Sequence, residues 1–353
     1  MRPANEISAS AAPIETDAII VGAGPCGLFQ VFELGLLGIK ADVVDSLQHP
    51  GGQCTELYPD KPIYDIPALP VCGAQELIDR LLQQIKPFEP RFHLGQEVAE
   101  LARRDDGRFF VRTALDTTFL ARTVVIAAGL GSFQPKKLAV EGADLLENRQ
   151  LHYRVRDAAR FHGQRLVIFG GGDSALDWVL DFCGKAASLV HVHRRTEFRA
   201  APASVARMRE LVAAGRMQYV EGTAATLRIG EGGRLEGVEV KRADGTMAGF
   251  DADHVLAFFG LHPKLGPIAE WGLDLEKKAI RVDTAKFQTT VPGIFAIGDI
   301  NHYPGKKKLI LSGFHEAALA AFAIAEHLNP AKKVHLQYTT TSPIMQKRLG
   351  VAG

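Results

Sequence analysis

The sequence predicts an α/β fold with two Rossmann-like domains of three-layer ββα architecture, the second inserted into the first. An apolar run at residues 16–21 leads into a glycine turn, a helical stretch over 28–37 and a second apolar run at 40–45. This is the order of a βαβ unit. The same order returns at 165–169, 170–172, 174–182 and 189–193. The first glycines of the two turns, Gly22 and Gly170, lie 148 residues apart, which indicates two separate nucleotide-binding units.

The domain boundaries follow from the strands between and after these units. At about 150 residues per domain, a chain of 353 residues predicts two domains. Apolar strands at 124–129, 255–260 and 293–299 suggest that the chain leaves the first domain and later returns to it. We therefore expect residues 14–130 and 254–353 to form one domain and 131–253 the inserted domain. Residues 1–13 are expected to be a flexible tail.

Composition excludes several classes of protein. The formal net charge of +1 lacks the basic excess of a nucleic-acid binder. The longest apolar candidate, residues 309–328, is interrupted by charged or titratable side chains at His315, Glu316, Glu326 and His327, so no membrane span is predicted. The N-terminus has no apolar signal segment, and we expect a soluble, cytoplasmic protein.

Cysteine and histidine spacing predicts no metal site. Cys26, Cys54, Cys72 and Cys183 are too far apart for a metal clip or a Cys-x-x-Cys pair, and unpaired cysteines are typical of a reducing compartment. Each is best interpreted as a small buried apolar residue. His191 and His193 alternate on a predicted strand, but no cysteine or carboxylate cluster accompanies them.

The first glycine turn matches Gly-x-Gly-x-x-Gly and contains Gly22, Gly24, Pro25, Cys26 and Gly27. Glycines at these positions let the backbone approach a pyrophosphate held at the helix N-terminus. Asp45 ends the next strand, where a carboxylate accepts hydrogen bonds from a ribose. The alternative is a purely structural turn, and the position of Asp45 favours the dinucleotide site.

The second turn contains Gly170, Gly171, Gly172, Asp173, Ser174 and Ala175. The position equivalent to Asp45 is His193, and the cations Arg194, Arg195 and Arg199 follow it. Guanidinium groups pair with the 2′-phosphate of NADP, and the missing carboxylate removes a repulsion. These residues predict NADP(H); the alternative is a solvated basic turn. A second dinucleotide beside NADPH should be a redox partner for its hydride, which predicts FAD in the first domain.

Further motifs resemble the flavoproteins with two dinucleotide-binding domains. Residues 290–299, which end in Asp299, carry this likeness. Within that group the chain resembles the thioredoxin-reductase-like ferredoxin–NADP(+) reductases, at Gly51-Gly52-Gln53, Tyr58-Pro59, residues 64–67, 170–178 and 309–317. The resemblance extends from about residue 14 to the C-terminus.

Two dithiol patterns found in related flavoproteins are missing. Thioredoxin reductases carry Cys-x-x-Cys shortly before the second glycine turn, where this chain has residues 153–156 without a cysteine. The larger disulfide reductases carry Cys-x4-Cys, of which Cys54 matches the first cysteine and Pro59 occupies the second position. Electrons are therefore expected to leave the flavin without a dithiol relay, and thioredoxin is not the expected acceptor.

The resemblance also implies roles for individual residues. Gln53 and Asp299 would bind FAD, and the helix after Gly313 would point its N-terminus at the flavin. Tyr58 would stack on one flavin face and Tyr338, in a C-terminal extension, on the other; alternatively, Tyr338 is an ordinary packing tyrosine. Thr340, and less strongly Ser342, would lie near flavin N5. None of these residues would act as an acid or a base.

The expected reaction is hydride transfer between NADPH and FAD, coupled to one-electron transfer with ferredoxin. Ferredoxins are generally acidic, so Lys306–Lys308 and Lys136–Lys137 are candidate docking residues, with solvated lysine loops as the alternative. The resemblance further implies a homodimer, in which the C-terminal segment of one chain could reach the flavin of the other. Alternative functions are NADPH-dependent reduction of a quinone, a free flavin or oxygen, and regulatory sensing of NADPH by a degenerate scaffold.

Overall fold

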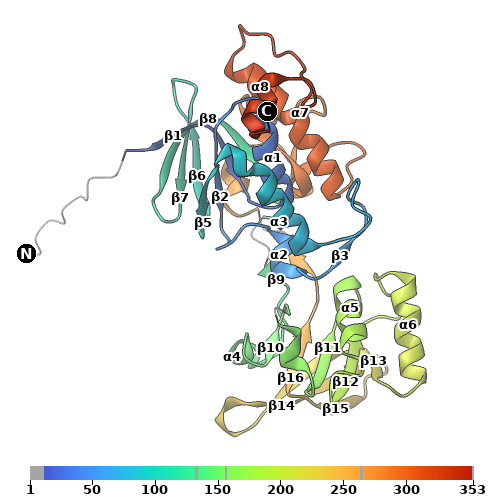
Figure 1. Cartoon of the computed structure of the whole chain (residues 1–353). Helices are drawn as coiled ribbons and strands as arrows, with labels where there is room; N and C mark the ends of the chain where they lie inside the picture. Colours follow the sequence, from blue (N-terminus) through green and yellow to red (C-terminus); the bar gives the residue numbers. More distant parts are fainter. Residues whose placement is uncertain (1–11, 132–133, 156, 263–264, 352–353) are drawn as a thin grey trace, which may run out of the picture. The chain divides into compact units, whose positions relative to one another are not determined.

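The computed structural model describes residues 12–131, 134–155, 157–262 and 265–351, and the chain divides into two compact units (Figure 1). The outer unit comprises residues 1–132 and 263–353, and the inserted unit comprises residues 133–262. Most of the expected flexible tail, residues 1–11, lies outside the described residues.

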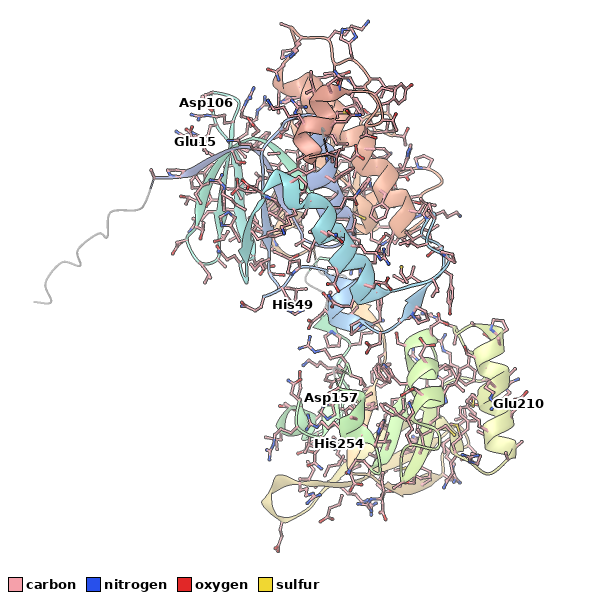
Figure 2. All side chains as sticks on the ribbon, viewed as in Figure 1. Glu15, His49, Asp106, Asp157, Glu210 and His254 are labelled. Atoms are coloured by element: carbon pink, nitrogen blue, oxygen red, sulfur yellow. The ribbon has the colours of Figure 1, made fainter. Side chains whose placement is uncertain are left out.

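The inserted unit extends further along the chain than the expected boundary at residue 253. The strand β16 (His254–Ala257), which begins at the His254 labelled in Figure 2, pairs in parallel with β11 (Arg165–Phe169). Beyond it, β17 (Leu261–His262) pairs with β9 (Gln134–Pro135). Residues 254–262 therefore complete the sheet of the inserted unit, because their backbone hydrogen bonds are made there.

The main sheet of the outer unit is parallel at its centre. Its order is β5 (Arg91–Leu94), β2 (Ala41–Asp45), β1 (Ile14–Val21), β8 (Thr118–Ile126), β7 (Phe109–Thr113) and β6 (Val98–Arg103). The strand β20 (Ile294–Ala296) also pairs in parallel with β8. Among the described residues, the antiparallel pairs of this sheet are β6 with β7 and β7 with β8. The carboxyl ends of β1, β2, β8 and β20 therefore meet at one edge of the sheet, where ligands bind in α/β folds.

Three helices cover one face of this sheet: α1 (Pro25–Leu36), α3 (Ala74–Ile85) and α7 (Ile310–Leu328). Because successive strand residues point to opposite faces, Ile20 packs under these helices while Ile19 packs on the other face. That face is covered by side chains from β6, β7 and residues 268–280. The helix expected over 28–37 begins earlier, at Pro25, because proline has no N–H to lose in a first helical turn.

The remaining elements of the outer unit are short. They are α2 (Gln53–Leu57), β3 (Pro62–Ile63), β4 (Cys72–Gly73), η1 (Lys86–Phe88), η4 (Gly266–Glu270), β18 (Leu275–Glu276), β19 (Ala279–Arg281), η5 (Gly298–Ile300), β21 (Asn301–His302) and α8 (Pro343–Leu349).

The inserted unit repeats the same plan. Its sheet runs β10 (Leu151–His152), β16, β11, β12 (Ser188–His193), β13 (Gln218–Ile229), β14 (Leu235–Arg242) and β15 (Met247–Asp251). The first five strands are parallel, and β13, β14 and β15 form an antiparallel meander. Side chains of α5 (Asp173–Phe182) and α6 (Pro202–Ala213) join the core on one face. The other elements are α4 (Ala143–Leu146), η2 (Ala158–Phe161) and η3 (Glu231–Gly233). The two-domain Rossmann-like fold is confirmed.

Candidate cofactor sites

The first glycine loop is closely packed on its protein side and open at one position. Gly22 has φ +111°, and a Cβ there would lie 2.5 Å from the carbonyl oxygen of Ala127. A Cβ at Gly27 would lie 2.0 Å from the oxygen of Gly22. At Gly24, by contrast, a Cβ would have no described atom within 4 Å. This open backbone at the start of α1 fits the approach of a pyrophosphate group.

Asp45 fastens the loop from the end of β2. Its Oδ2 accepts a 2.6 Å hydrogen bond from the backbone N–H of Ala23, and its Oδ1 accepts one of 2.8 Å from that of Leu47. Burial raises the pKa of the Asp45 carboxyl, against the opposing effect of these two donors. Since each carboxylate oxygen has two lone pairs, Asp45 can hold the loop and still accept bonds from ribose hydroxyls.

The turn before α2 lies directly beside this loop. The N–H of Gly51 donates a 2.8 Å hydrogen bond to the oxygen of Ala23, and a Cβ at Gly52 would lie 3.1 Å from the Cα of Gly24. Gln53 begins α2, and Tyr58 follows its last residue. Burial raises the pKa of the Tyr58 hydroxyl, and the neighbouring Cys54 adds to this rise. The structure therefore brings Gln53 and Tyr58 to the edge of the sheet that carries the glycine loop.

Cys26, in the first turn of α1, packs against the segment that contains Asp299. Its sulfur would lie 3.2 Å from a Cβ at Gly298 and 2.2 Å from a Cβ at Gly313. Glycines at these two positions thus let η5 and α7 approach the start of α1. Burial raises the pKa of the Cys26 thiol to about 12, so the thiol is neutral. Asp299 is half-buried, and burial raises its pKa while Lys308 and Lys306 lower it.

The second glycine loop shows the same division into packed and open positions. Gly170 has φ +144°, and a Cβ there would lie 2.5 Å from the oxygen of Phe258 and 2.8 Å from the Cβ of Ala175. A small residue at Ala175 is therefore required by close packing. No described atom lies within 4 Å of a Cβ placed at Gly172, and Ser174 is exposed at the start of α5. Both positions remain accessible to a phosphate.

Residues 193–199, here named the arginine loop, are fastened to this glycine loop. The N–H of Arg199 donates to the oxygen of Gly171 at 2.7 Å. Oδ1 of Asp173 accepts a 2.9 Å bond from the N–H of Ala201, so Asp173 orients the loop through the backbone. The ring of His193 lies so close to Gly171 that a Cβ there would be 2.1 Å from it.

His191, on β12, forms a hydrogen bond with the second glycine loop. Its Nε2–H donates a 2.7 Å hydrogen bond to the oxygen of Gly170, and its Nδ1 has no partner among the described residues. Burial lowers the pKa of this imidazole to about 4, so the ring is neutral at physiological pH. The sequence pattern raised His191 only as a possible metal ligand and gave no sign of this bond. The described residues contain no group of three or more side chains that could hold a metal ion.

A cavity of about 710 Å³ opens over the second glycine loop within the inserted unit. Its lining includes Gly170–Gly172, the cations Arg194, Arg195 and Arg199, and Lys136 with Lys137. The three arginine side chains form no ion pair with any described residue. A cavity of this size suits a nucleotide. Unpaired guanidinium groups around it suit a phosphate that carries more than one negative charge.

Comparison with known proteins identifies the family. Residues 16–323 match the family described as pyridine nucleotide-disulphide oxidoreductase. A ferredoxin–NADP reductase 2 of Cupriavidus metallidurans is 64% identical over 339 residues, which are 96% of this chain and 92% of that protein. A ferredoxin–NADP reductase of Methylibium petroleiphilum is 62% identical over 343 residues, 96% of this chain and 93% of that protein. The chain belongs to the ferredoxin–NADP reductase family.

Solved structures support the fold of this reductase. Thioredoxin reductase of Lactococcus lactis matches with a TM-score of 0.74 at 22% identity, over 89% of this chain and 99% of that one. Thioredoxin reductase of T. acidophilum matches with a TM-score of 0.73 at 23% identity, over 88% and 98%. At these identities the likeness concerns the fold. The four cysteines of the present reductase are all free.

The C-terminal residues of the reductase do not lie at the glycine loop of their own chain. Tyr338 is 65% exposed, and the following helix α8 packs at the C-terminal end of α1, where Arg348 donates a 2.5 Å bond to the oxygen of Leu36. The glycine loop is at the other end of α1, about 18 Å away for a helix of twelve residues. Figure 1 accordingly shows α8 and α2 at opposite ends of the unit. Ser342 caps α8, and Thr340 lies in the turn before it.

The candidate docking lysines differ in exposure and in their partners. The side chain of Lys306 is buried and paired with Glu316, so only Lys307 and Lys308 of that group are exposed. Lys136 and Lys137 line the cavity of the inserted unit, and Lys137 pairs with Glu147 and lies 5.0 Å from the ring centre of Tyr153.

Proposed function

We propose that this chain is an FAD-dependent ferredoxin–NADP(+) reductase that moves electrons between NADPH and ferredoxin. The observation that carries the proposal is the cavity of the inserted unit, where the glycine loop lies beside three arginines that form no ion pair with a described residue. The relatives that cover nearly the whole chain at 62–65% identity are named ferredoxin–NADP reductase. Site and family thus support the same activity.

Binding of NADPH follows from the chemistry of the cavity lining. The pyrophosphate is expected at Gly172 and Ser174, because the N–H groups of Asp173 and Ser174 at the start of α5 form no hydrogen bond with a described residue. The 2′-phosphate is expected at Arg194, Arg195 and Arg199. His193 stands where an acidic residue would favour NAD, and its ring is held by a 3.0 Å hydrogen bond to the oxygen of Glu197.

FAD is expected to bind in the outer unit, at the first glycine loop and the residues beside it. Gly22, Gly24, Pro25, Cys26 and Gly27 would hold its pyrophosphate, Asp45 its ribose, and Gln53, Tyr58 and Asp299 the flavin half. When bound, FAD supplies the step between a hydride, which carries two electrons, and a ferredoxin cluster, which takes one. The protein contributes binding and orientation, and no side chain is assigned as a general acid or base.

The cysteines favour a one-electron protein acceptor over a disulfide. Cys54 is buried and Cys26 is half-buried, and desolvation raises the pKa of the two thiols to about 11 and about 12. Neutral thiols are poor nucleophiles, and no partner cysteine pairs with either. Electrons therefore have no thiol route out of this site.

A homodimer would give Tyr338 its expected role. Tyr338 lies beside α8, away from the first glycine loop of its own chain, and the C-terminal segment exposes apolar side chains at Leu336, Tyr338 and Ile344. We propose that Tyr338 and Thr340 reach the flavin of a second copy. One chain has a mass of 38.3 kDa, so sedimentation equilibrium should give twice this value. A monomer would exclude this role.

We also propose a cytoplasmic location. Its support is the four free cysteines, which persist in a reducing compartment. No helix among the described residues is long and apolar enough to cross a membrane. Cell fractionation with compartment markers would test the location.

The function is tested by NADPH-driven reduction of cytochrome c, with and without a bacterial ferredoxin, beside a thioredoxin–disulfide control. Strong stimulation by ferredoxin and no disulfide reduction is the expected result. Activity with dyes or quinones that ferredoxin does not stimulate would instead indicate a reductase of small acceptors. A colourless protein that binds NADPH without turnover would indicate a regulatory sensor.

A further inference from the structure

Glu316 is a buried carboxylate that gathers four donors from one short segment. It lies on α7 with 0% exposure. Its Oε2 accepts from the N–H of Gly298 at 2.7 Å and from Nδ2 of Asn301 at 2.8 Å. Its Oε1 accepts from the hydroxyl of Tyr303 at 2.9 Å and from the ammonium group of Lys306. Residues 298–306 are therefore wrapped around a single side chain.

The charge on Glu316 is balanced within the same cluster. The side chain of Lys306 is only 4% exposed, and its ammonium group also lies 5.3 Å from the ring centre of Tyr303. Burying a carboxylate is costly unless it is paired with a cation and hydrogen-bonded, and Glu316 has one cation and three further donors around it. Apolar residues of similar size often replace such pairs without loss of stability. The pair is therefore better explained by what it holds in place.

Glu316 and its four donors hold in place the turn that contains Asp299. Gly298, whose N–H is bound by Glu316, has φ +76° and packs against Cys26 at the start of α1. Asn301 is held on the far side of Asp299 by Glu316 and by the oxygen of Ala296 at 2.9 Å. Asp299 lies between these two anchors, and its carboxylate forms no hydrogen bond or ion pair with a described residue.

We propose that Glu316 and Lys306 are positioning residues that fix the turn of Asp299 for FAD. This inference rests on the assignment of FAD to the outer unit. Asp299 is free to bond the cofactor, while the side-chain hydrogen bonds on either side of it converge on Glu316. Loss of the Glu316 charge would weaken the hold on the N–H of Gly298 and leave Lys306 buried without its counter-ion.

The test compares the FAD dissociation constant with the stability of the apoprotein. FAD is titrated by fluorescence quenching into apoprotein carrying Glu316→Gln, Lys306→Met or both changes, and unfolding of each apoprotein is followed in urea. Each single change should raise the FAD dissociation constant about tenfold or more, the effect of losing one hydrogen bond to a charged group. The double variant should bind FAD more tightly than the product of the single effects predicts, because no unpaired charge remains.

Matched controls lie on exposed positions of the same unit. Glu326→Gln, on the exposed face of α7, and Lys333→Met should leave FAD binding unchanged. Tyr303→Phe removes one donor without a change of charge, and it should weaken FAD binding less than Glu316→Gln. This variant keeps the test decisive if Glu316→Gln does not fold.

Two outcomes would overturn the inference. Unchanged FAD binding in Lys306→Met and Tyr303→Phe, with or without a loss of apoprotein stability, would reduce the cluster to a structural role. Strictly multiplicative effects in the double variant would show that the two residues do not act as a pair. Failure of the unmodified apoprotein to bind FAD would instead count against the proposed function as well, so the two failures are distinguishable.

Discussion

The backbone N–H of Arg199 donates a 2.7 Å hydrogen bond to the carbonyl oxygen of Gly171. This bond and the 2.9 Å bond from the N–H of Ala201 to Asp173 hold the arginine loop against the second glycine loop. The backbone that carries the arginines is therefore already ordered, which reduces the entropic cost of binding an anion there.

The first prediction concerns coenzyme preference. Replacing Arg194 and Arg199 by glutamine should lower kcat/KM for NADPH about tenfold or more, because bonds to the charged 2′-phosphate are lost. The value for NADH, which lacks this phosphate, should change little. Steady-state kinetics with both coenzymes measure the effect. Arg207→Gln is the control, since Arg207 pairs with Glu210 on α6 and is not among the residues that line the cavity. An equal loss with both coenzymes would contradict the assignment.

The second prediction separates the two glycine loops. Gly170→Ala places a Cβ 2.5 Å from the oxygen of Phe258, and Gly22→Ala places one 2.5 Å from that of Ala127. The backbone must shift in each case, and both glycines also have positive φ. Gly170→Ala should raise the dissociation constant for NADP(H) and leave the FAD content normal, whereas Gly22→Ala should yield protein depleted of FAD. Absorbance of the purified proteins and equilibrium titration distinguish these results. Loss of FAD in Gly170→Ala would contradict the division of cofactors.

The third prediction concerns the contact of Cys26 with Gly313. Gly313→Ala puts a Cβ 2.2 Å from the sulfur of Cys26 and should destabilise the fold by about 1–3 kcal/mol, the usual cost of overpacking. Cys26→Ala removes the sulfur and should restore most of this loss in the double variant. Urea unfolding of the four proteins gives the coupling free energy. Additive effects would mean that the two side chains do not compete for the same space.

The fourth prediction is a pH dependence of stability. Burial lowers the pKa of His191 from 6.5 to about 4. Between these values the unfolded chain binds a proton that the folded chain does not, so stability falls as the pH is lowered from 6.5 to 4. His191→Gln keeps a donor for Gly170 and should remove up to about 3 kcal/mol of this loss. Urea unfolding from about pH 7.5 to about pH 4 measures it, with the exposed His162→Gln as control. An unchanged pH profile would show that His191 is accessible to protons when folded.

The fifth prediction tests the exposed lysines as a ferredoxin contact. Charge reversal at Lys307 and Lys308 should raise the KM for ferredoxin several-fold and leave reduction of a small dye unchanged, because only the protein partner uses this surface. Lys306 is excluded because its side chain is buried. Lys332→Glu with Lys333→Glu is the matched control on an exposed segment of the same unit. A parallel fall of both activities would place the defect at the cofactors.

The amino-acid sequence by itself determined the features that are local in the chain. Both glycine loops, the acid at Asp45 and the arginines that follow His193 are short patterns, and each needs only its own strand and helix to have meaning. The repeat of one βαβ unit after 148 residues was enough to predict two domains and two dinucleotides. Glycines with positive φ and a proline in the first turn of α1 act through their own backbone, so they can be recognised without a partner.

Only the tertiary structure decided which distant side chains meet. The strand β16 belongs to the inserted unit because β11 offers it a free edge, and strand pairing is not encoded in β16 alone. Lys136 shares a cavity with arginines almost sixty positions later, and Tyr338 lies beside α8, at the end of α1 opposite to the first glycine loop. Glu316 was visible only as an acid that interrupts an apolar helix; its four donors became apparent once residues 298–306 folded back over α7. Burial makes such contacts specific, because a polar group removed from water needs a hydrogen-bond partner. That partner can only come from a segment that the fold brings close to it.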